Sequence, residues 1–259
     1  MTCRLSTVDY RLSVTDNAPM TLGPSDTKVL VLAGGLGTRL RPLTETLPKV
    51  LVPVLGRPFL EHVLHEVTGQ GLTRLVLSVG VFSDQVEACF GDGGRLGCSI
   101  EYARETTPLG TGGAIVNALP LLGERFLVLN GDTLLEVDLR RLLRHHEDQQ
   151  LDVTLTAVRV PDRGRYGALV LEGGRVARFE EKRPGAGPGW INGGVYVMER
   201  RLLASPPGAV FSLERDLLPA HLGRIAAFET RGYFVDMGTH AALASLDSSL
   251  AAYLARKRG

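Results

Sequence analysis

The chain has 259 residues, which is enough for one large α/β domain or two small ones. A hydrophobic fraction of 44% with 22% charged residues is ordinary for a protein with a packed core. The net charge of +1 provides no bulk field that would attract nucleic acid or a membrane surface, so neither is expected as a partner. No apolar run approaches the roughly 18 residues of a membrane span. The three cysteines have no metal-ligand spacing, and the sequence favours a cytoplasmic location.

Residues 1–26 are mixed polar and lack the apolar core of a signal peptide. We interpret them as a poorly ordered N-terminal extension, within which Met20 is an alternative start. Residues 27–259 are expected to form the folded domain. Its two halves are expected to span about 27–150 and 151–245.

Strand and helix signals alternate through the first half. Short apolar runs predict strands covered on both faces, and residues at helical spacing predict the helices between them. Ser83 is expected to cap the second of these helices. The strands are expected at 28–34, 74–80, 98–105 and 125–135, and the helices at 58–71, 83–93, 110–122 and 138–149. Repeated units of this kind predict a doubly wound, mostly parallel sheet, with ligands at the carboxyl ends of its strands.

The second half is richer in strands. An alternating strand is expected at 152–160, a hairpin at 166–182 around Gly173-Gly174, and a further strand at 191–198. A helix capped by Ser212 and a late pair of strands within 225–238 follow. We interpret this half as a small β-rich, mixed-sheet extension that supplies a second wall of the site.

Several residues are not assigned to a site. His145 and His146 lie on a predicted helix away from the strand ends and are expected at the surface. Trp190 is expected either as a wall of the site or as a core residue. The basic tail YLARKRG is expected to be a solvent-exposed helix end.

A glycine-led loop follows the first strand in the segment GGLGTRLRPLTETLPKVLVPVLGRP, residues 34–58. It lacks the Lys-Ser or Lys-Thr of a Walker A loop, and it lacks the third glycine of a dinucleotide fingerprint. A dehydrogenase is therefore disfavoured. Glycines let backbone N–H groups surround anionic oxygens, and Arg39 and Lys49 add positive charge. The loop favours a polyphosphate, although glycines alone would equally suit an ordinary turn with basic residues on its surface.

The whole segment resembles the signature of the sugar-phosphate nucleotidylyltransferases, and the resemblance runs from about residue 28 to residue 242. It implies a Rossmann-like α/β fold and the reaction NTP + sugar 1-phosphate → NDP-sugar + pyrophosphate, with Mg²⁺ as cofactor. Members are often dimeric or tetrameric, so a homo-oligomer is also expected by resemblance. A nucleotide-sugar sensor without activity is the alternative, but it should lack one of the charged residues, and Arg39, Lys49, Asp132, Lys182 and Asp236 are all present.

The resemblance implies a role for each residue that matches the family's motifs. The catalytic group is Arg39, Lys49, Asp132 and Lys182, and the metal ligands are Asp132 and Asp236. The nucleotide-binding residues are Leu32, Ala33, Gly34, Gly35, Gly37, Thr38, Arg39 and Gly110. The residues that bind the sugar phosphate are Lys49, Gly131, Glu181, Lys182, Asn192 and Gly193.

The positions of these residues agree with such chemistry, although each has a simpler reading. Asp132 ends a buried strand at the edge where a parallel sheet holds ligands, which suits Mg²⁺. Asn-Gly-Asp is equally good turn chemistry. Glu181 and Lys182 end the hairpin, where a solvated acid–base cluster is the ordinary alternative.

The motifs PLGTGGAI, LVLNGDT, INGGVYV, FSLERDLLP and YFVDMGT together resemble the heptose 1-phosphate guanylyltransferase branch. That branch implies GTP and D-glycero-D-manno-heptose 1-phosphate. The family pattern often continues Ile-Pro-Glu-Asp-Tyr after the last motif, whereas this chain has Thr239-His240 there. Mannose 1-phosphate or glucose 1-phosphate with another NTP therefore stays open.

Overall fold

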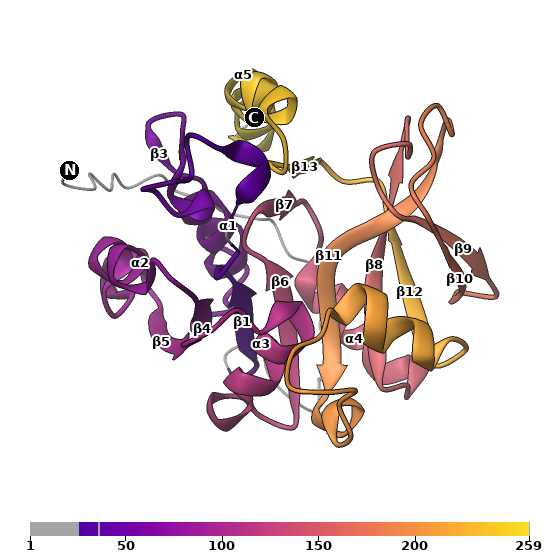
Figure 1. The fold of residues 1–259 in the computed structure, drawn as a ribbon. Helices are drawn as coiled ribbons and strands as arrows, with labels where there is room; N and C mark the ends of the chain where they lie inside the picture. Colours follow the sequence, from indigo (N-terminus) through magenta and orange to yellow (C-terminus); the bar gives the residue numbers. More distant parts are fainter. Residues whose placement is uncertain (1–25, 36, 259) are drawn as a thin grey trace.

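The computed structural model describes residues 26–35 and 37–258, so the predicted extension at 1–26 lies almost wholly outside the described residues. Nine strands form one sheet (Figure 1). In spatial order they are β5 (Ser99–Arg104), β4 (Arg74–Val79), β1 (Lys28–Leu32), β6 (Arg125–Asn130), β11 (Gly189–Glu199), β8 (Val153–Val160), β12 (Ile225–Thr230), β10 (Arg175–Glu180) and β9 (Ala168–Glu172).

The sheet is mixed, and it is less parallel than the sequence predicted. The pairs β5–β4, β4–β1, β1–β6 and β8–β12 are parallel, while the other four neighbouring pairs are antiparallel. The reason is β11, which runs antiparallel to both β6 and β8 and joins the two halves. The parallel half thus places the carboxyl ends of β1, β4 and β6 at one edge.

The second half closes on itself. Besides its place in the sheet, β11 pairs with β9, so that β11, β8, β12, β10 and β9 form a five-stranded, barrel-like unit. The hairpin between β9 and β10 is as predicted: Gly173 and Gly174 have φ of 56° and 74°, which a two-residue hairpin turn requires. The expected β-rich extension is therefore a small barrel.

Helices cover both faces of the sheet because alternate strand residues point to opposite sides. Val29 and Val31 of β1 pack into one core cluster with α1, α2, α4 and α5, while Leu30 packs into another with α3. These helices are α1 (Phe59–Thr68), α2 (Ser83–Phe90), α3 (Gly110–Ala118), α4 (Leu139–Gln149) and α5 (His240–Arg258). Among the described residues, no helix is long and apolar enough to cross a bilayer.

The late strands do not pair with each other as a hairpin. β12 joins the barrel, whereas β13 (Phe234–Asp236) pairs with β7 (Thr133–Leu135) in a separate antiparallel ribbon. β2 (Pro53–Val54) and β3 (Arg57–Pro58) form another small ribbon, within the loop that precedes α1. Short helical turns complete the chain: η1 (Thr38–Leu40), η2 (Lys49–Leu51), η3 (Gly94–Leu96), η4 (Leu119–Leu121), η5 (Arg200–Leu203), η6 (Leu213–Leu217) and η7 (Leu218–His221).

Two capping predictions have different outcomes. Ser212 does cap the turn that follows it, because its hydroxyl accepts from the Arg215 amide, but the predicted helix is a short π-helical turn followed by a 3₁₀ turn. Ser83 is not the cap of α2: the helix begins at Ser83 itself, Phe82 precedes it, and no side chain caps the first turn.

The predicted surface positions of the two histidines are wrong, and that of the basic tail is wrong at Lys257, although Arg256 is exposed as predicted. His146 is 1% exposed, with its ring between Thr154 of β8 and Glu199 of β11. His145 is partly buried, with its ring edge-on to Phe228 at 5.4 Å. In the tail, Lys257 forms an ion pair with Glu66 of α1, a carboxylate that is buried. A helical pattern alone did not show that both faces of these helices have neighbours.

Candidate active site

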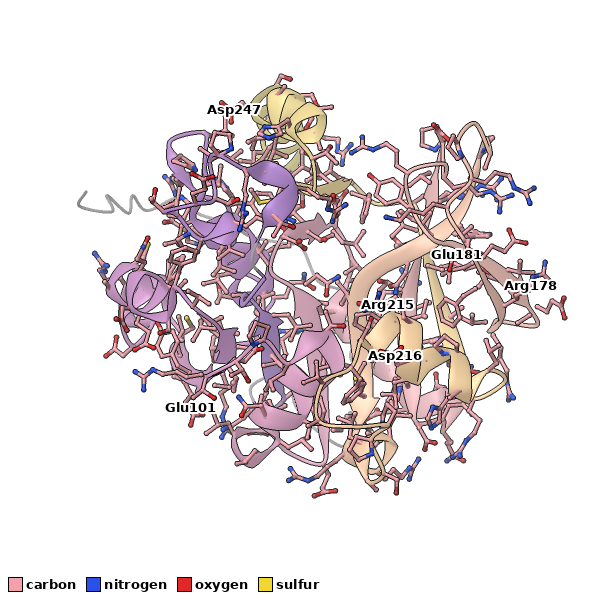
Figure 2. All side chains as sticks on the ribbon, in the orientation of Figure 1. Glu101, Arg178, Glu181, Arg215, Asp216 and Asp247 are labelled. Carbon is pink, nitrogen blue, oxygen red and sulfur yellow. The ribbon has the colours of Figure 1, made fainter. Side chains whose placement is uncertain are left out.

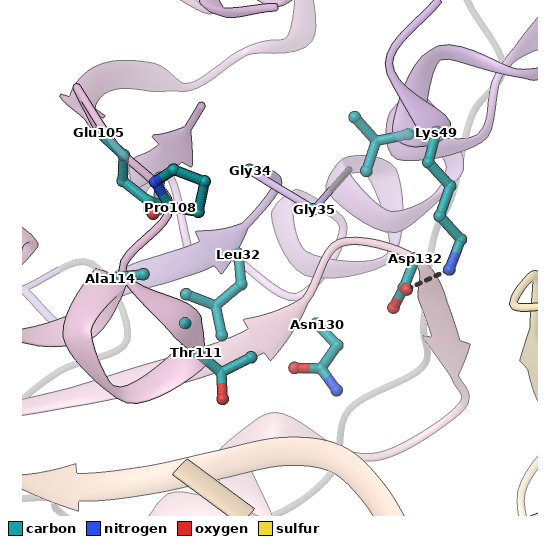
Figure 3. Close-up of a pocket in the computed structure, with 13 residues that line it drawn as sticks. Leu32, Gly34, Gly35, Lys49, Glu105, Pro108, Thr111, Ala114, Asn130 and Asp132 are labelled. Atoms are coloured by element: carbon teal, nitrogen blue, oxygen red, sulfur yellow. Dashed lines mark hydrogen bonds and ion pairs between the residues drawn. The ribbon is translucent and has the colours of Figure 1, made fainter. Parts of the chain in front are cut away.

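A cavity of about 270 Å³ lies at the carboxyl ends of β1 and β6, opposite the start of α3 (Figure 3). Six of the predicted site residues line it: Leu32, Gly34, Gly35, Lys49, Gly110 and Asp132. The remaining lining residues were not predicted: Val50, Ser78, Glu105, Pro108, Thr111, Ala114 and Asn130. The cavity therefore lies where ligands bind in open α/β sheets.

The glycine-led loop folds back on itself beside this cavity. Gly37 has φ 60°, and its carbonyl accepts from the Thr44 hydroxyl at 2.8 Å. A Cβ at Gly37 would lie 3.0 Å from the Cβ of Lys49, so the glycine lets the two ends of the loop meet. Gly34 is equally confined, because a Cβ there would lie 2.7 Å from the Glu105 carboxylate. Thr38 and Arg39 stay exposed on the outer turn, and Ala33 is buried behind it.

Lys49 and Asp132 form an ion pair across the cavity. The Lys49 side chain is 8% exposed and that of Asp132 is 33% exposed, so the lysine is held against the protein while the carboxylate still faces solvent. The other Asp132 oxygen accepts from the Thr133 hydroxyl at 3.3 Å. This pair places a cation and an anion where the predicted phosphates would meet.

The backbone of Asp236 lies next to that of Asp132. The ribbon pairs Asp236 with Thr133, and the Met237 amide donates to the Asp132 carbonyl at 3.1 Å. One Asp236 oxygen accepts from the Gly238 amide at 2.6 Å. A Cβ at Gly238 would lie 3.5 Å from an Arg39 guanidinium nitrogen, so Arg39 reaches the same turn.

These two aspartates fit Mg²⁺. Proteins commonly hold this ion with one or two carboxylates and let substrate phosphates complete its shell. Among residues 26–35 and 37–258, no group of three or more His, Cys, Asp or Glu side chains is arranged to hold a metal. Asp132, in the turn before β7, and Asp236, at the end of β13, would supply the one or two carboxylates that Mg²⁺ ordinarily takes from a protein.

Glu105 forms the opposite end of the cavity and was missed from the sequence. One carboxylate oxygen accepts from the Ser78 hydroxyl and the other from the Leu109 amide, each at 3.0 Å. Gly110 follows with φ 73°, packed against the Phe211 carbonyl. The only signal in the sequence was its place between a strand end and a glycine-rich helix start.

A polar network borders the cavity on the barrel side. The Asn192 amide donates to the hydroxyl of the fully buried Tyr196, which donates to Glu214; Glu214 also accepts from the Thr111 hydroxyl at 2.8 Å. Burial raises the pKa of Tyr196 well above its usual value, so this hydroxyl stays protonated. Asn130, which lines the cavity, has a buried side-chain oxygen without a hydrogen-bond partner.

The other predicted sugar-phosphate residues differ in position. Gly131 packs against the Leu32 carbonyl, where a Cβ would lie at 2.8 Å, and Gly193 packs against the Thr156 hydroxyl, where a Cβ would lie at 2.6 Å. Glu181, labelled in Figure 2, and Lys182 follow β10 on the barrel. Both are exposed, and neither lines the cavity. The structure thus does not bring these two residues to the others.

Comparisons with known proteins agree with this geometry. The mannose-1-phosphate guanylyltransferase of Mycobacterium tuberculosis is 42% identical over 217 residues, which cover 81% of this chain and 60% of that protein. The D-glycero-alpha-D-manno-heptose 1-phosphate guanylyltransferase of Aneurinibacillus thermoaerophilus is 35% identical over 82% of this chain and 93% of its own. Several of the curated relatives are longer, and the matched region spans about three fifths of their length.

A solved structure shares the fold over almost its whole length. The crystal structure of HddC from Yersinia pseudotuberculosis, complexed with GMP-PN, superposes with a TM-score of 0.79 at 33% identity, over 86% of this chain and 99% of that one. The family model "Nucleotidyl transferase" matches residues 28–252, which include the glycine-led loop, both aspartates and the barrel. From this match, and from the cavity that the loop and the aspartates share, the chain belongs to the nucleotidyl transferase family.

Proposed function

We propose that the protein transfers a nucleotidyl group from GTP to a sugar 1-phosphate, giving a GDP-sugar and pyrophosphate. The observation that carries this proposal is the ion pair of Lys49 and Asp132 in a cavity lined by Gly34 and Gly35, with Asp236 on the ribbon that begins directly after Asp132. A transfer of this kind needs positioned charge and an in-line approach rather than a covalent intermediate.

Each group has a role in the proposed reaction. Gly34, Gly35 and Gly37 bring backbone N–H groups to the triphosphate, and Arg39 supports the pyrophosphate as it leaves. Lys49 exchanges its contact with Asp132 for the oxygens of the α-phosphate and the incoming sugar phosphate. The phosphate of the sugar attacks the α-phosphorus, and the bond from the α-phosphorus to the bridging oxygen of pyrophosphate breaks. Mg²⁺, when held by Asp132 and Asp236, would neutralise charge on these phosphates.

Guanine is the base that best suits the Glu105 end of the cavity. Guanine presents two donors side by side, N1–H and the 2-amino group, and an ionised carboxylate is a pure acceptor with two oxygens. Each Glu105 oxygen is already oriented by one donor and has a further lone pair available. The named activities of the relatives, both guanylyltransferases, support the same choice.

The sugar is proposed to have the manno configuration. Heptose 1-phosphate is the acceptor that the sequence motifs favoured, and mannose 1-phosphate is the acceptor in the name of the relative at 42% identity. The two sugars share their ring configuration and differ beyond C5. The network of Asn192, Glu214 and Thr111, together with the unpartnered oxygen of Asn130, supplies the groups for ring hydroxyls.

The test is pyrophosphate release over a matrix of five NTPs and several hexose and heptose 1-phosphates. We expect turnover with GTP and a manno-configured acceptor, and the ratio of kcat/KM for heptose and mannose assigns the sugar. No release in any combination would contradict the enzyme proposal and favour a nucleotide-sugar sensor.

A second arm tests the base. Inosine triphosphate lacks the 2-amino group, so we expect the wild type to prefer GTP over it about tenfold or more, as one charge-assisted hydrogen bond allows. Glu105→Gln should reduce that preference. Glu101→Gln is the matched control, because Glu101 lies on β5, the strand that Glu105 directly follows, but forms an exposed ion pair with Lys28. An unchanged preference in Glu105→Gln would contradict the guanine contact.

A further inference from the structure

We propose that Glu136 is a positioning residue for Asp236, and that Arg256 of the C-terminal helix supports it. The inference rests on the proposed function, because it concerns the two aspartates that are proposed to hold Mg²⁺. Neither Glu136 nor Arg256 touches the cavity at the ends of β1 and β6. Their effect would pass through the ribbon of β7 and β13.

The ribbon connects the two places directly. At one end, the Met237 amide donates to the Asp132 carbonyl; at the other, the Glu136 amide donates to the Tyr233 carbonyl at 2.8 Å. The Glu136 carboxylate closes this second end, because it accepts from the Tyr233 amide at 2.9 Å. A ribbon of three residue pairs has few hydrogen bonds of its own, so its register depends on such end contacts.

The backbone just before β13 packs directly against the backbone of residue 136. A Cβ at Gly232 would collide with the Glu136 carbonyl, so the chain passes in direct contact with residue 136 before β13 begins. Glu136 therefore holds the incoming chain at Gly232 and Tyr233 with both its backbone and its carboxylate. Asp236 lies three residues further along the same strand.

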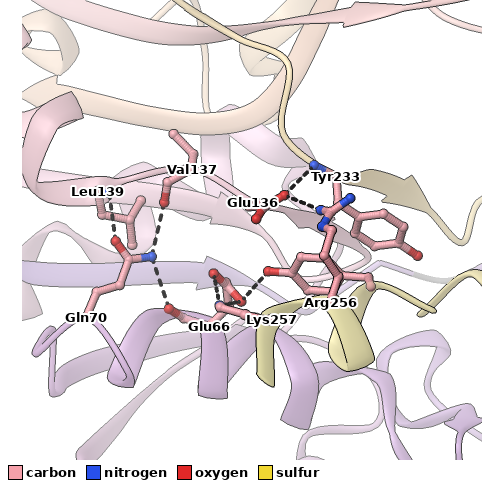
Figure 4. Close-up of polar contacts among 9 residues, drawn as sticks. Glu66, Gln70, Glu136, Val137, Leu139, Tyr233, Arg256 and Lys257 are labelled. Carbon is pink, nitrogen blue, oxygen red and sulfur yellow. Dashed lines mark hydrogen bonds and ion pairs between the residues drawn. The ribbon is translucent and has the colours of Figure 1, made fainter. Parts of the chain in front are cut away.

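The C-terminal helix holds the Glu136 carboxylate in turn (Figure 4). Arg256 donates to it at 2.8 Å, from the last turns of α5. The helix is fixed there by Glu66 of α1, which accepts from the Tyr253 hydroxyl at 3.0 Å and from Lys257. Tyr253 also stacks on Tyr233 with ring centroids 4.5 Å apart. The contacts of residues 253–257 lie beyond the segment that the family model matches.

The same helix, α5, also contacts the glycine-led loop of residues 34–58. The ring of His240 hydrogen-bonds to the Arg41 carbonyl at 3.1 Å, and Asp247 accepts from the Leu55 amide at 3.0 Å. One helix thus braces both the loop that carries Lys49 and the ribbon that carries Asp236. Loss of the Glu136 side-chain contacts would loosen the ribbon while the loop contacts stay. The position of Asp236 relative to Asp132 would then be less well fixed.

The experiment uses the full chain and three variants. Glu136→Ala removes both contacts, Glu136→Gln keeps an acceptor for the Tyr233 amide but loses the charge, and Arg256→Gln removes only the ion pair. Arg201→Gln is the matched control: its side chain is 64% exposed, as is that of Arg256, and it pairs with Asp152 near the opposite end of the sheet. Hydrogen exchange of the free protein is measured for each, together with Mn²⁺ binding by electron paramagnetic resonance in the presence of saturating GTP, which supplies the phosphate ligands.

We expect Glu136→Ala to weaken Mn²⁺ binding about 5- to 20-fold and to raise amide exchange selectively at residues 233–238. Glu136→Gln should restore most of the affinity, Arg256→Gln should cost about 2- to 3-fold, and Arg201→Gln should change neither quantity. If Glu136→Ala does not fold, Arg256→Gln against Arg201→Gln carries the same comparison.

The outcomes separate this inference from the proposed function. Wild-type affinity for Mn²⁺ with unchanged exchange at 233–238 in the variants would overturn the positioning role of Glu136 and leave the proposed function intact. A wild type that binds no Mn²⁺ and releases no pyrophosphate would overturn the proposed function itself. A lower melting temperature alone, without the change in Mn²⁺ affinity, also counts against the inference.

Discussion

Two lysines that the sequence assigned to one reaction lie in different environments. Lys49 is buried in the parallel half, is fixed by its ion pair with Asp132 and lines the cavity. Lys182 is exposed on the barrel half, outside the cavity lining, and within the described part of the chain it has no hydrogen bond or ion pair. Of the two cations predicted to bind the sugar phosphate, Lys49 is therefore held in place by the protein and Lys182 is not.

The architecture explains this difference. Lys49 follows Pro48 at the start of a short helical turn and packs against Gly37 of the same loop, so its position is set by a compact segment on the sheet. Lys182 follows the end of β10, on a two-stranded corner of the barrel that meets β12 at a single residue pair. Among the described residues, Lys182 therefore lacks the packing and the ion pair that fix Lys49.

The largest expected effect on turnover is at Asp132, the partner of Lys49. Asp132→Asn removes a charge from the proposed metal site and leaves Lys49 without its partner, so kcat should fall roughly 10²- to 10³-fold, the cost typical of losing one preorganised electrostatic group. Nucleotide binding, measured by calorimetry, should partly survive. A variant with a near-normal rate would rule out the metal role of Asp132.

Lys182→Ala tests the role of the exposed lysine on the barrel half. If the lysine contacts the sugar phosphate only in the complex, its loss should raise the KM for that substrate about 10- to 100-fold, as expected for a hydrogen bond to a charged group. The KM for GTP should change much less. The measurement is a steady-state assay of pyrophosphate release. Equal increases in KM for both substrates would contradict the proposed contact of Lys182 with the sugar phosphate.

A smaller effect is expected at Gly34. An alanine there would bring its Cβ to 2.7 Å from Glu105 and 3.3 Å from the Gly80 amide, so Glu105 must shift. Because Glu105 is held by Ser78 and Leu109, we expect the KM for GTP to rise several-fold while the KM for the sugar phosphate is unchanged. Gly208→Ala is the matched control, since nothing lies within 4 Å of a Cβ at that position and Gly208 does not line the cavity.

The parts of the site that the sequence revealed are those formed by contiguous residues. The glycine-led loop and the strand end at Asp132 are local patterns, and their meeting follows from the rule for strand ends in α/β sheets. The pairing of β13 with β7 is a contact between residues about a hundred positions apart, so resemblance, not pattern, placed Asp236 beside Asp132. Glu105 carried no pattern beyond its neighbours and was overlooked.

The wrong surface assignments have one physical origin. His146 and Lys257 are polar residues on helices, and a polar residue on a helix is ordinarily solvent-exposed. Both are instead paired across to a distant element: His146 with Glu199, and Lys257 with Glu66. Such partners cannot be read from helical periodicity, since periodicity describes one helix and not what packs on it.

His146 gives the smallest predicted effect, on stability rather than turnover. Burial lowers the pKa of its imidazole below the ordinary 6.5, against a weaker opposing effect of Glu199. The unfolded chain then takes up a proton near pH 6.5 that the folded chain takes up only at lower pH, so this contribution to stability is complete above pH 6.5 and declines as the pH falls below it. His62, which is also buried, contributes in the same direction.

Thermal unfolding between pH 5.5 and 8 measures this effect. We expect the melting temperature of the wild type to fall by a few degrees at the acid end, as about 1 kcal/mol would produce in a chain of this size. His146→Gln should melt lower at neutral pH but lose less on acidification, because the group that titrates is gone. A slope in His146→Gln identical to that of the wild type would show that the buried imidazole is not the group responsible.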